Sequence, residues 1–273
     1  MSKTKRPNLF LAVDFVLLTL TPDKEKSLEV LLLKRPEDPH QGTWTLPGAF
    51  VHLGEDRNLP EAIDRILKEK VQIPIGKQDW ENQQLGCFYS MERDNRNVVT
   101  VVYWGLVPIS NAKKFNEDQV VSESLKFSPV GNYIGENRKE ELPFDHTEIL
   151  QKAIEHLSET MERKSTATKF FEKELTTSDL RLAYETVWSY SDEYETLVSE
   201  INPTNFAHFL KKQWKDFSLL QPDTTSTEQM YLDQNVPQGR PPRNWKRDLD
   251  VLEDKKLKYP LPRKPRPSKP EKS

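Results

Sequence analysis

The stretch that decides the fold is residues 46–56, LPGAFVHLGED, together with the helical pattern that follows it. Apolar side chains recur at helical spacing over 59–72, which predicts an amphipathic helix; they are Leu59, Ala62, Ile63, Ile66 and Leu67. A Gly-Glu turn that opens a helix can deliver a carboxylate to a metal ion. Further carboxylates should then follow, yet residues 65–73, RILKEKVQI, contain only Glu69. The stretch therefore indicates either a metal-dependent hydrolase or a hydrolase scaffold with another function.

The same residues resemble the Nudix box, G-x5-E-x7-R-E-U-x-E-E-x-G-U, in which U is aliphatic. Two extra residues lie near Arg57 and Asn58. Three positions match, namely Glu55, Arg65 and Glu69, and four depart, namely Ala49 for Gly, Ile66 for Glu, Lys70 for Glu and Gln72 for Gly. The segments LAVDFVLL, LEVLLLKRP and GTWTLPG precede the box in the Nudix order. The resemblance implies a Nudix α/β/α sandwich with a mixed sheet.

The departures bear on catalysis. Carboxylates at 66, 69 and 70 would share one helix face by their spacing and would hold Mg²⁺ or Mn²⁺. Ile66 removes a ligand, and Lys70 places a positive charge where a cation would lie, at a cost of several kcal/mol for an effective dielectric of about 20. We therefore expect no metal and no normal Nudix catalysis, with Glu55, Arg65 and Glu69 as remnants. If Mg²⁺ or Mn²⁺ does bind, Glu55 and Glu69 are the expected ligands.

The order of predicted elements divides the chain into domains. Strands are predicted at 9–20, 28–34, 43–50, 84–90 and 97–108, and helices at 59–72 and 145–163, with Asp145 as N-cap. Strands on both sides of two helices indicate an α/β or α+β domain over 1–160. Over 161–250, helices at 176–188, 192–200 and 202–215 precede a predicted β-hairpin at 219–236. This is the order of a winged helix-turn-helix.

A resemblance to one Nudix-related group covers residues 9 to about 248. The NrtR-type transcriptional regulators join a Nudix-like domain to a winged helix-turn-helix. The matching segments are RILKEK, MERDNRNVVTVVYWGLVP, LPFDHTEIL, TTSDLRLAYETVW, NPTNFAHFLKK and GRPPRNWKRD. The resemblance implies a homodimer that binds duplex operator DNA, commonly near genes of NAD metabolism, and a Nudix-like domain that senses a nucleotide such as ADP-ribose.

Two sets of candidate binding residues follow. For the nucleotide we predict Arg35, Arg65, Glu69 and Lys70 near the phosphates and Trp44 against a base, although Trp44 is equally consistent with a core position. In the third helix of the second domain, Phe206, Phe209, Leu210 and Trp214 form an apolar stripe. Side chains off that stripe and near the wing are predicted to contact DNA; they are Asn205, His208, Lys211, Lys212, Arg240, Arg243, Lys246 and Arg247.

Composition restricts the other possibilities. The chain has 273 residues, a net charge of -3 and one cysteine, Cys87, which excludes an internal disulfide framework and fits the cytoplasm. No apolar run of membrane-spanning length is present. Residues 240–273 contain twelve Lys or Arg and five Asp or Glu, a balance of +7, and 251–273 is predicted to be a disordered basic, Pro-rich tail. Two alternatives to the regulator remain, an active Nudix hydrolase for ADP-ribose or a related nucleoside diphosphate, and a non-enzymatic protein-interaction module.

Overall fold

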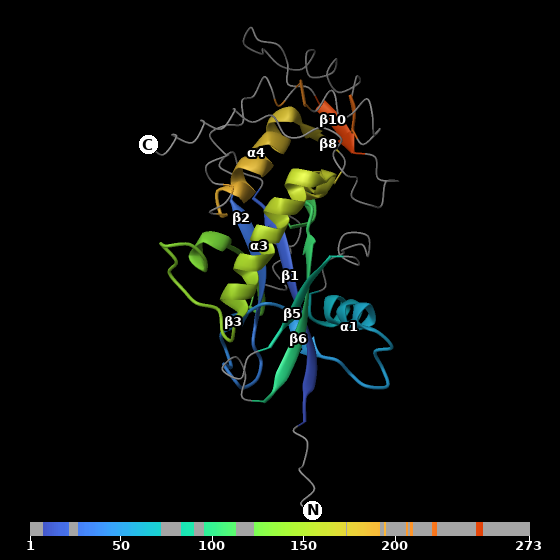
Figure 1. Cartoon of the computed structure of the whole chain (residues 1–273), viewed down its shortest axis with the longest axis vertical. Coiled ribbons are helices and arrows are strands. Elements are labelled where there is room, and N and C mark those ends of the chain that lie inside the picture. The colour runs from blue at the N-terminus through green and yellow to red at the C-terminus, as the bar shows by residue number, and fades with distance from the viewer. Residues whose placement is uncertain are drawn as a thin grey trace, which may run out of the picture. The chain divides into compact units, whose positions relative to one another are not determined.

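The structure is a computed structural model of the chain (Figure 1). It describes residues 8–21, 27–71, 83–89, 96–112, 123–172, 174–191, 194, 206, 208–209, 220–222 and 244–247. The chain forms two compact units, residues 1–156 and 157–273. The division falls within the helix α3 (His146–Arg163). The basic tail predicted at 251–273 lies outside the described residues. So does the helix predicted at 192–200, except for Tyr194, which is not assigned to a helix.

The first unit is built on a mixed seven-stranded sheet. Its main path runs β3-β2-β1-β6-β5, while β4 pairs with β1 and β7 with β2. The strands are β1 (Phe10–Leu20), β2 (Leu28–Lys34), β3 (Trp44–Thr45), β4 (Gly48–Phe50), β5 (Gln84–Phe88), β6 (Val98–Leu106) and β7 (Leu125–Pro129). The parallel β1–β6 pair lies at the centre, with Phe10 opposite Val98 and Leu18 opposite Leu106. The α/β class predicted from the sequence is confirmed.

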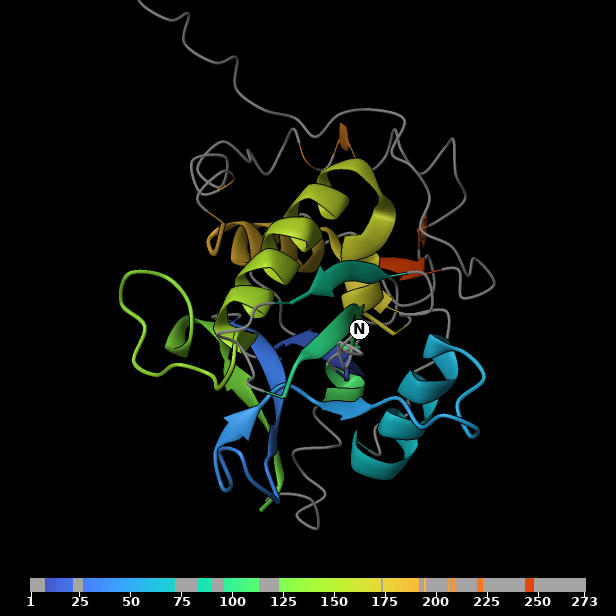
Figure 2. The same cartoon turned by 60° about the horizontal axis from the view of Figure 1, so that its bottom comes forward.

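The two faces of β1 pack against different helices. Its odd-numbered residues Val13, Phe15 and Leu17 are fully buried in a core shared with α1 (Leu59–Ile66). On the even-numbered face of β6, the Trp104 ring makes an edge contact with His156 of α3 at 5.7 Å between centroids. Even-numbered residues of β1 lie opposite even-numbered residues of β6, so their side chains share one face of the sheet. The helix α1 and the first turns of α3 therefore cover opposite faces (Figure 2). The unit is therefore a helix–sheet–helix sandwich.

The helix α1 begins where its sequence favours a start. The Asn58 side chain accepts a hydrogen bond from the backbone N–H of Glu61, and Pro60 occupies the first turn, where its missing N–H has no cost. After Ile66 the chain continues as a π-helical turn, η1 (Leu67–Val71). π turns of this kind are often found at functional sites. Here the turn carries Glu69 and Lys70, the last described residues of the Nudix-like box that could face a ligand.

The second unit contains a predicted helix and a small sheet. The helix predicted at 176–188 is confirmed as α4 (Thr177–Trp188), which opens with a capping box in which Thr176 and Asp179 exchange hydrogen bonds. Tyr184 donates to the carbonyl of Met161 at 3.0 Å, and the Trp188 indole donates to that of Ser158 at 3.3 Å. The end of α3 and α4 are thus joined by buried aromatic donors.

The sheet of the second unit includes strands that were not predicted. Strand β10 (Asn244–Arg247) pairs antiparallel with β9 (Leu220–Pro222) on one side and with β8 (Glu174–Thr176) on the other. Apart from β9, the hairpin predicted at 219–236 lies outside the described residues, and β9 pairs with a strand beyond residue 240 that was not predicted. No strand was predicted at 174–176. Elements of three or four residues are too short to show a periodic pattern.

No helix in the described part of the chain is long and apolar enough to cross a membrane.

Candidate functional site

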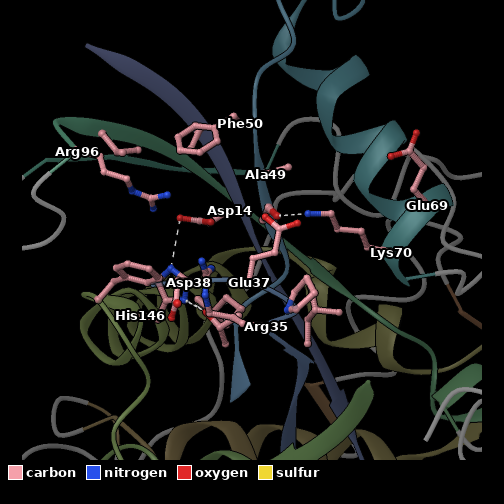
Figure 3. Close-up of a pocket in the computed structure, with 18 of the residues that line it drawn as sticks. Asp14, Arg35, Glu37, Asp38, Ala49, Phe50, Glu69, Lys70, Arg96 and His146 are labelled. Atoms are coloured by element: carbon pink, nitrogen blue, oxygen red, sulfur yellow. Dashed lines mark hydrogen bonds and ion pairs between the residues drawn. The ribbon is translucent and has the colours of Figure 1, made fainter. Parts of the chain in front are cut away.

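A cavity of about 350 Å³ lies at the end of the first unit's sheet where β4 pairs with β1. It is within the size range of small-molecule sites. Its lining combines apolar side chains with charged groups of both signs. Among the lining residues are Asp14, Arg35, Phe50, Lys70, Arg96 and His146 (Figure 3). These residues come from segments up to 132 positions apart, Asp14 to His146. Arg35, Arg65, Glu69 and Lys70 line this cavity as well, so four of the five predicted nucleotide-site residues meet there.

Lys70 is tied to the strand that faces it. Its ammonium donates to the carbonyl oxygen of Gly48 at 2.9 Å, and its side chain is partly buried (Figure 3). Burial lowers the pKa of Lys70 from its usual range, and the nearby positive charges of Arg65 and Arg35 lower it further. Three cationic side chains thus lie near one another at this part of the wall, with Glu69 and Asp14 as neighbouring anionic groups.

Ile66 does not lie beside Glu69 and Lys70 in the cavity. Its side chain is fully buried in the core with Ala62 and Ile63, and it does not line the cavity. The expectation that positions 66, 69 and 70 share one exposed face is wrong for Ile66. The reason is that Ile66 continues the apolar stripe of α1, four residues after Ala62 and three after Ile63.

The remaining carboxylates of the box do not form a metal site. Glu55 pairs with His52 at 3.1 Å on the surface, and its side chain is 73% exposed. Glu69 is 60% exposed and lies at the rim, 4.0 Å from Arg65. Within the described ranges, no three His, Cys, Asp or Glu side chains are close enough to hold a metal ion together. With the Lys70 ammonium on the Gly48 carbonyl, these residues do not fit Mg²⁺ or Mn²⁺.

The guanidinium of Arg65 forms hydrogen bonds within the protein. Its Nε and Nη2 donate to the two carboxylate oxygens of Asp56 at 3.1 and 2.8 Å, and Nη2 also donates to the Phe50 carbonyl at 3.0 Å. The side-chain hydrogen bond from Arg65 lowers the pKa of Asp56 to about 2, assisted by the backbone N–H of His52. This bidentate pair fixes the loop 50–56 against α1. Arg65 was predicted to face phosphate, and the structure assigns it this bracing contact at the cavity wall.

A buried carboxylate and imidazole lie together on the cavity floor. Asp14 Oδ2 is 3.6 Å from His146 Nε2, and both side chains are more than nine-tenths buried. The backbone N–H of Leu46 donates to His146 Nδ1 at 3.2 Å, and Thr45 Oγ1 lies 2.6 Å from the same nitrogen. Because an N–H can only donate, neutral His146 carries its proton on Nε2, the nitrogen that faces Asp14. His146 thus lines the cavity from the first residue of α3.

Asp14 leaves no room for a side chain on the neighbouring strand. A Cβ built on Gly48 would lie 2.0 Å from Asp14 Oδ1 and 3.0 Å from the carbonyl oxygen of Val13. The glycine is therefore required by the close approach of β4 to β1, not by an unusual backbone angle. It also leaves the Gly48 carbonyl exposed to Lys70.

Two arginines are seated on aromatic rings at the cavity. Arg35 lies over the ring of Phe144 at 5.0 Å and donates from Nε to the Pro39 carbonyl at 2.7 Å. Arg96 lies over the ring of Phe50 at 5.3 Å. Such contacts hold a guanidinium in place at little cost in hydration. Phe144 has a positive φ of 61°, a conformation that is rare for a bulky residue and common at functional sites.

The sequence missed several cavity residues and misplaced one. Asp14, Phe50, Arg96 and Phe144 were not predicted, because no local pattern connects them. Trp44 does not line the cavity, and its ring lies under the Lys126 ammonium at 4.4 Å. The contact of a base with Trp44 in this cavity is therefore not supported by the geometry.

The predicted DNA-contacting residues are described only in part. Phe206 and Phe209 are buried and His208 is exposed, as expected for the two faces of one helix. Lys246 and Arg247 lie in β10. Asn205, Lys211, Lys212, Arg240 and Arg243 lie outside the described residues.

Comparison with known proteins gives relatives of two kinds, although no family model matches the chain. The chain is 27% identical over 192 residues to the ADPR responsive transcriptional repressor NtrR of Acinetobacter baylyi, which covers 70% of this chain and 71% of the relative. It is 32% identical over 128 residues to an ADP-ribose pyrophosphatase of Methanocaldococcus jannaschii, which covers 46% of this chain and 66% of the relative.

The fold has a solved counterpart over most of the chain. The crystal structure of Shewanella oneidensis NrtR aligns with a TM-score of 0.67 and 21% identity, and the alignment covers 92% of this chain and 100% of that one. A likeness at this identity establishes the fold, and the Acinetobacter relative adds the relationship in sequence. The resemblance to NrtR-type regulators that the sequence predicted is thus confirmed, and the chain has their Nudix-like fold.

Proposed function

We propose that this protein is a nucleotide-responsive, DNA-binding transcriptional regulator whose Nudix-like unit senses its effector without cleaving it. The observation that carries the proposal is the 27% identity to an ADPR responsive transcriptional repressor over 70% of the chain. By this likeness the effector is ADP-ribose or a related nucleoside diphosphate, bound in the cavity of the first unit. DNA is bound by the second unit, which contains α4 and the sheet β8-β10-β9.

Ligand and DNA would be coupled by a shift between two arrangements of the protein. A nucleotide that binds better to the arrangement unable to bind DNA releases the operator. In a homodimer, two copies of the second unit would read a two-fold symmetric operator, with half-sites about one helical turn apart. The Nudix-like unit then serves as a sensor, and no chemical step is needed.

A hydrolase is the second candidate, because the chain is 32% identical over 128 residues to an ADP-ribose pyrophosphatase. The geometry favours the sensor. The side chains of Glu55 and Glu69 are mostly exposed, and the Lys70 ammonium donates to the carbonyl of Gly48. Asp56 and Glu61 are engaged by Arg65 and Arg57. None of these acidic groups replaces the two carboxylates that the box lacks.

The test of the proposed function is selection of duplexes from a random pool by the full-length protein, with and without ADP-ribose. We expect enrichment of a roughly palindromic site and its release by ADP-ribose. Affinity for that site should fall steeply with salt, because phosphate contacts release counterions. If no duplex is retained even at low salt, the regulator is excluded and a protein-interaction module takes its place.

A further inference from the structure

We propose that the Lys70 ammonium replaces the divalent cation of a Nudix site, so that the cavity binds the diphosphate of a nucleotide without any metal ion. The inference rests on the proposed function and specifies how its sensor recognises the ligand. It starts from the misfit described above, in which the remaining glutamates of the box, Glu55 and Glu69, are mostly exposed while the Lys70 ammonium lies in the cavity wall.

The first support is the position of the ammonium. Gly48 accepts one of the three N–H donors of Lys70, at 2.9 Å, and the side chain lines the cavity. The carbonyl thus anchors the amine at a fixed point in the wall (Figure 3). An ammonium has no acceptor and three donors, so an anchored lysine can still donate to an anion in the cavity.

The second support is the change in charge relative to the Nudix box. Position 70 changes from negative to positive through Lys70, whereas Ile66 lies in the core and does not line the cavity. In the box, metal ions are needed to overcome the repulsion between clustered carboxylates and a phosphate. In this chain position 70 provides a fixed positive charge instead of one of those carboxylates.

The third support is a second fixed cation in the same cavity. Arg35 is held by the Pro39 carbonyl and by the ring of Phe144. Its positive charge is close enough to contribute to the lowered pKa of Lys70. A diphosphate has two anionic groups, and a guanidinium with an ammonium provides one fork-shaped and one point-like partner for them. A lone phosphate would satisfy only one of the two, which predicts a preference for diphosphates over monophosphates.

The same arrangement opposes a metal ion. A divalent cation placed near the Gly48 carbonyl would meet the positive charge of Lys70 at short range, with repulsion in place of a ligand. Four acidic residues line the cavity, namely Asp14, Glu37, Asp38 and Glu69. Asp14 faces His146 and Glu69 is largely exposed, and within the described residues no three His, Cys, Asp or Glu side chains are grouped so that they could hold a metal ion. Added Mg²⁺ should therefore leave binding unchanged.

The experiment is calorimetry of the full-length protein with α,β-methylene ADP-ribose, which cannot be hydrolysed, in a chelator and in excess Mg²⁺. We expect dissociation constants that agree within about threefold, less than 1 kcal/mol. Lys70→Met should weaken binding at least about tenfold in both buffers. Lys70→Glu should weaken it further in chelator and recover part of the loss in Mg²⁺, because a carboxylate then offers an oxygen ligand.

Lys68→Gln is the matched control, because Lys68 belongs to the same π turn but is exposed and does not line the cavity. It should bind as the unsubstituted protein does. Thermal unfolding of each variant establishes that the fold is retained.

Wild-type binding that requires Mg²⁺, or unchanged binding by Lys70→Met, overturns the inference. Absence of binding in both buffers overturns it as well. Retention of the selected duplex and its release by ADP-ribose, measured separately, report whether the proposed function fails with it.

Discussion

Arg65, in the last turn of α1, and Asp56, two residues before the N-cap of α1, share two hydrogen bonds, of 3.1 and 2.8 Å. The Asp56 side chain is only 3% exposed, and Arg65 also holds the Phe50 carbonyl. A loop of seven residues, 50–56, is thereby fixed at the edge of the ligand cavity. In a metal-binding box this loop would present a carboxylate to the ion, and here it is fastened by an internal ion pair.

The pair predicts a loss of stability in acid. The pKa of Asp56 is lowered from 3.8 to about 2 in the folded protein. A carboxyl with a lowered folded pKa stabilises the fold above its unfolded pKa, and this contribution is lost as pH falls from 3.8 through about 2. Urea unfolding at pH 5 and again near pH 2.5 should show a smaller difference for Asp56→Asn than for the wild type. Glu148→Gln, which breaks an exposed pair with Lys152, should keep the wild-type difference.

Hydrolysis is predicted to be negligible. ADP-ribose incubated with the protein and Mg²⁺ or Mn²⁺ should be cleaved far below the ordinary enzymatic range of about 1–1000 per second. The reason is that Glu55 and Glu69 are mostly exposed and belong to no group of three possible metal ligands among the described residues. Release of AMP can be followed by chromatography, with an active ADP-ribose pyrophosphatase as positive control. Turnover within that range would restore the hydrolase as the function.

Restoring the missing glutamate at position 66 should damage the fold instead of building a metal site. Ile66 is fully buried among apolar side chains, so Ile66→Glu would place a carboxylate without partners in the core. We expect a loss of about 3 kcal/mol or more in the free energy of unfolding. Ile66→Val, as control, should cost only about 0.5–1.5 kcal/mol. A stable Ile66→Glu protein that gains Mg²⁺ binding would contradict the observed orientation of this residue.

Substitutions at two positions of the second unit should weaken DNA binding in different ways. His208 is exposed between the buried Phe206 and Phe209, so His208→Ala should cost about 1 kcal/mol on the selected site and little on scrambled duplexes. Lys246 lies in β10, and Lys246→Ala should weaken all duplexes alike and reduce the salt slope by about one. A salt titration on both duplexes separates the two patterns. Equal effects on both by His208→Ala would argue against base reading.

Sequence patterns predicted the elements whose signals are local. The apolar runs at 9–20 and 28–34 form β1 and β2, and the helix predicted at 176–188 forms α4. The alternation of Phe206, His208 and Phe209 between buried and exposed was also correct. In each case a few neighbouring side chains determine the backbone, so the outcome could be deduced from spacing alone.

The cavity could be predicted only where a motif marked it. Arg35, Arg65, Glu69 and Lys70 were found because they lie in or near a familiar box. Asp14 and His146 come together through the pairing of β1 with β4 and the position of α3. The spacing of residues within either segment does not predict this contact. The strand β10 was missed for the same reason, since its partners are more than 20 residues away in the chain.

The Asp14 side chain restricts which residue can occupy position 48. With Asp14 present, even a methyl group at position 48 would lie 2.0 Å from a carboxylate oxygen. A larger residue at position 48 would therefore force the Asp14 carboxylate to move away from His146, and it would still meet the Val13 carbonyl at 3.0 Å. Asp14 thus keeps this part of β4 free of a side chain, in the residue whose carbonyl accepts the hydrogen bond from Lys70.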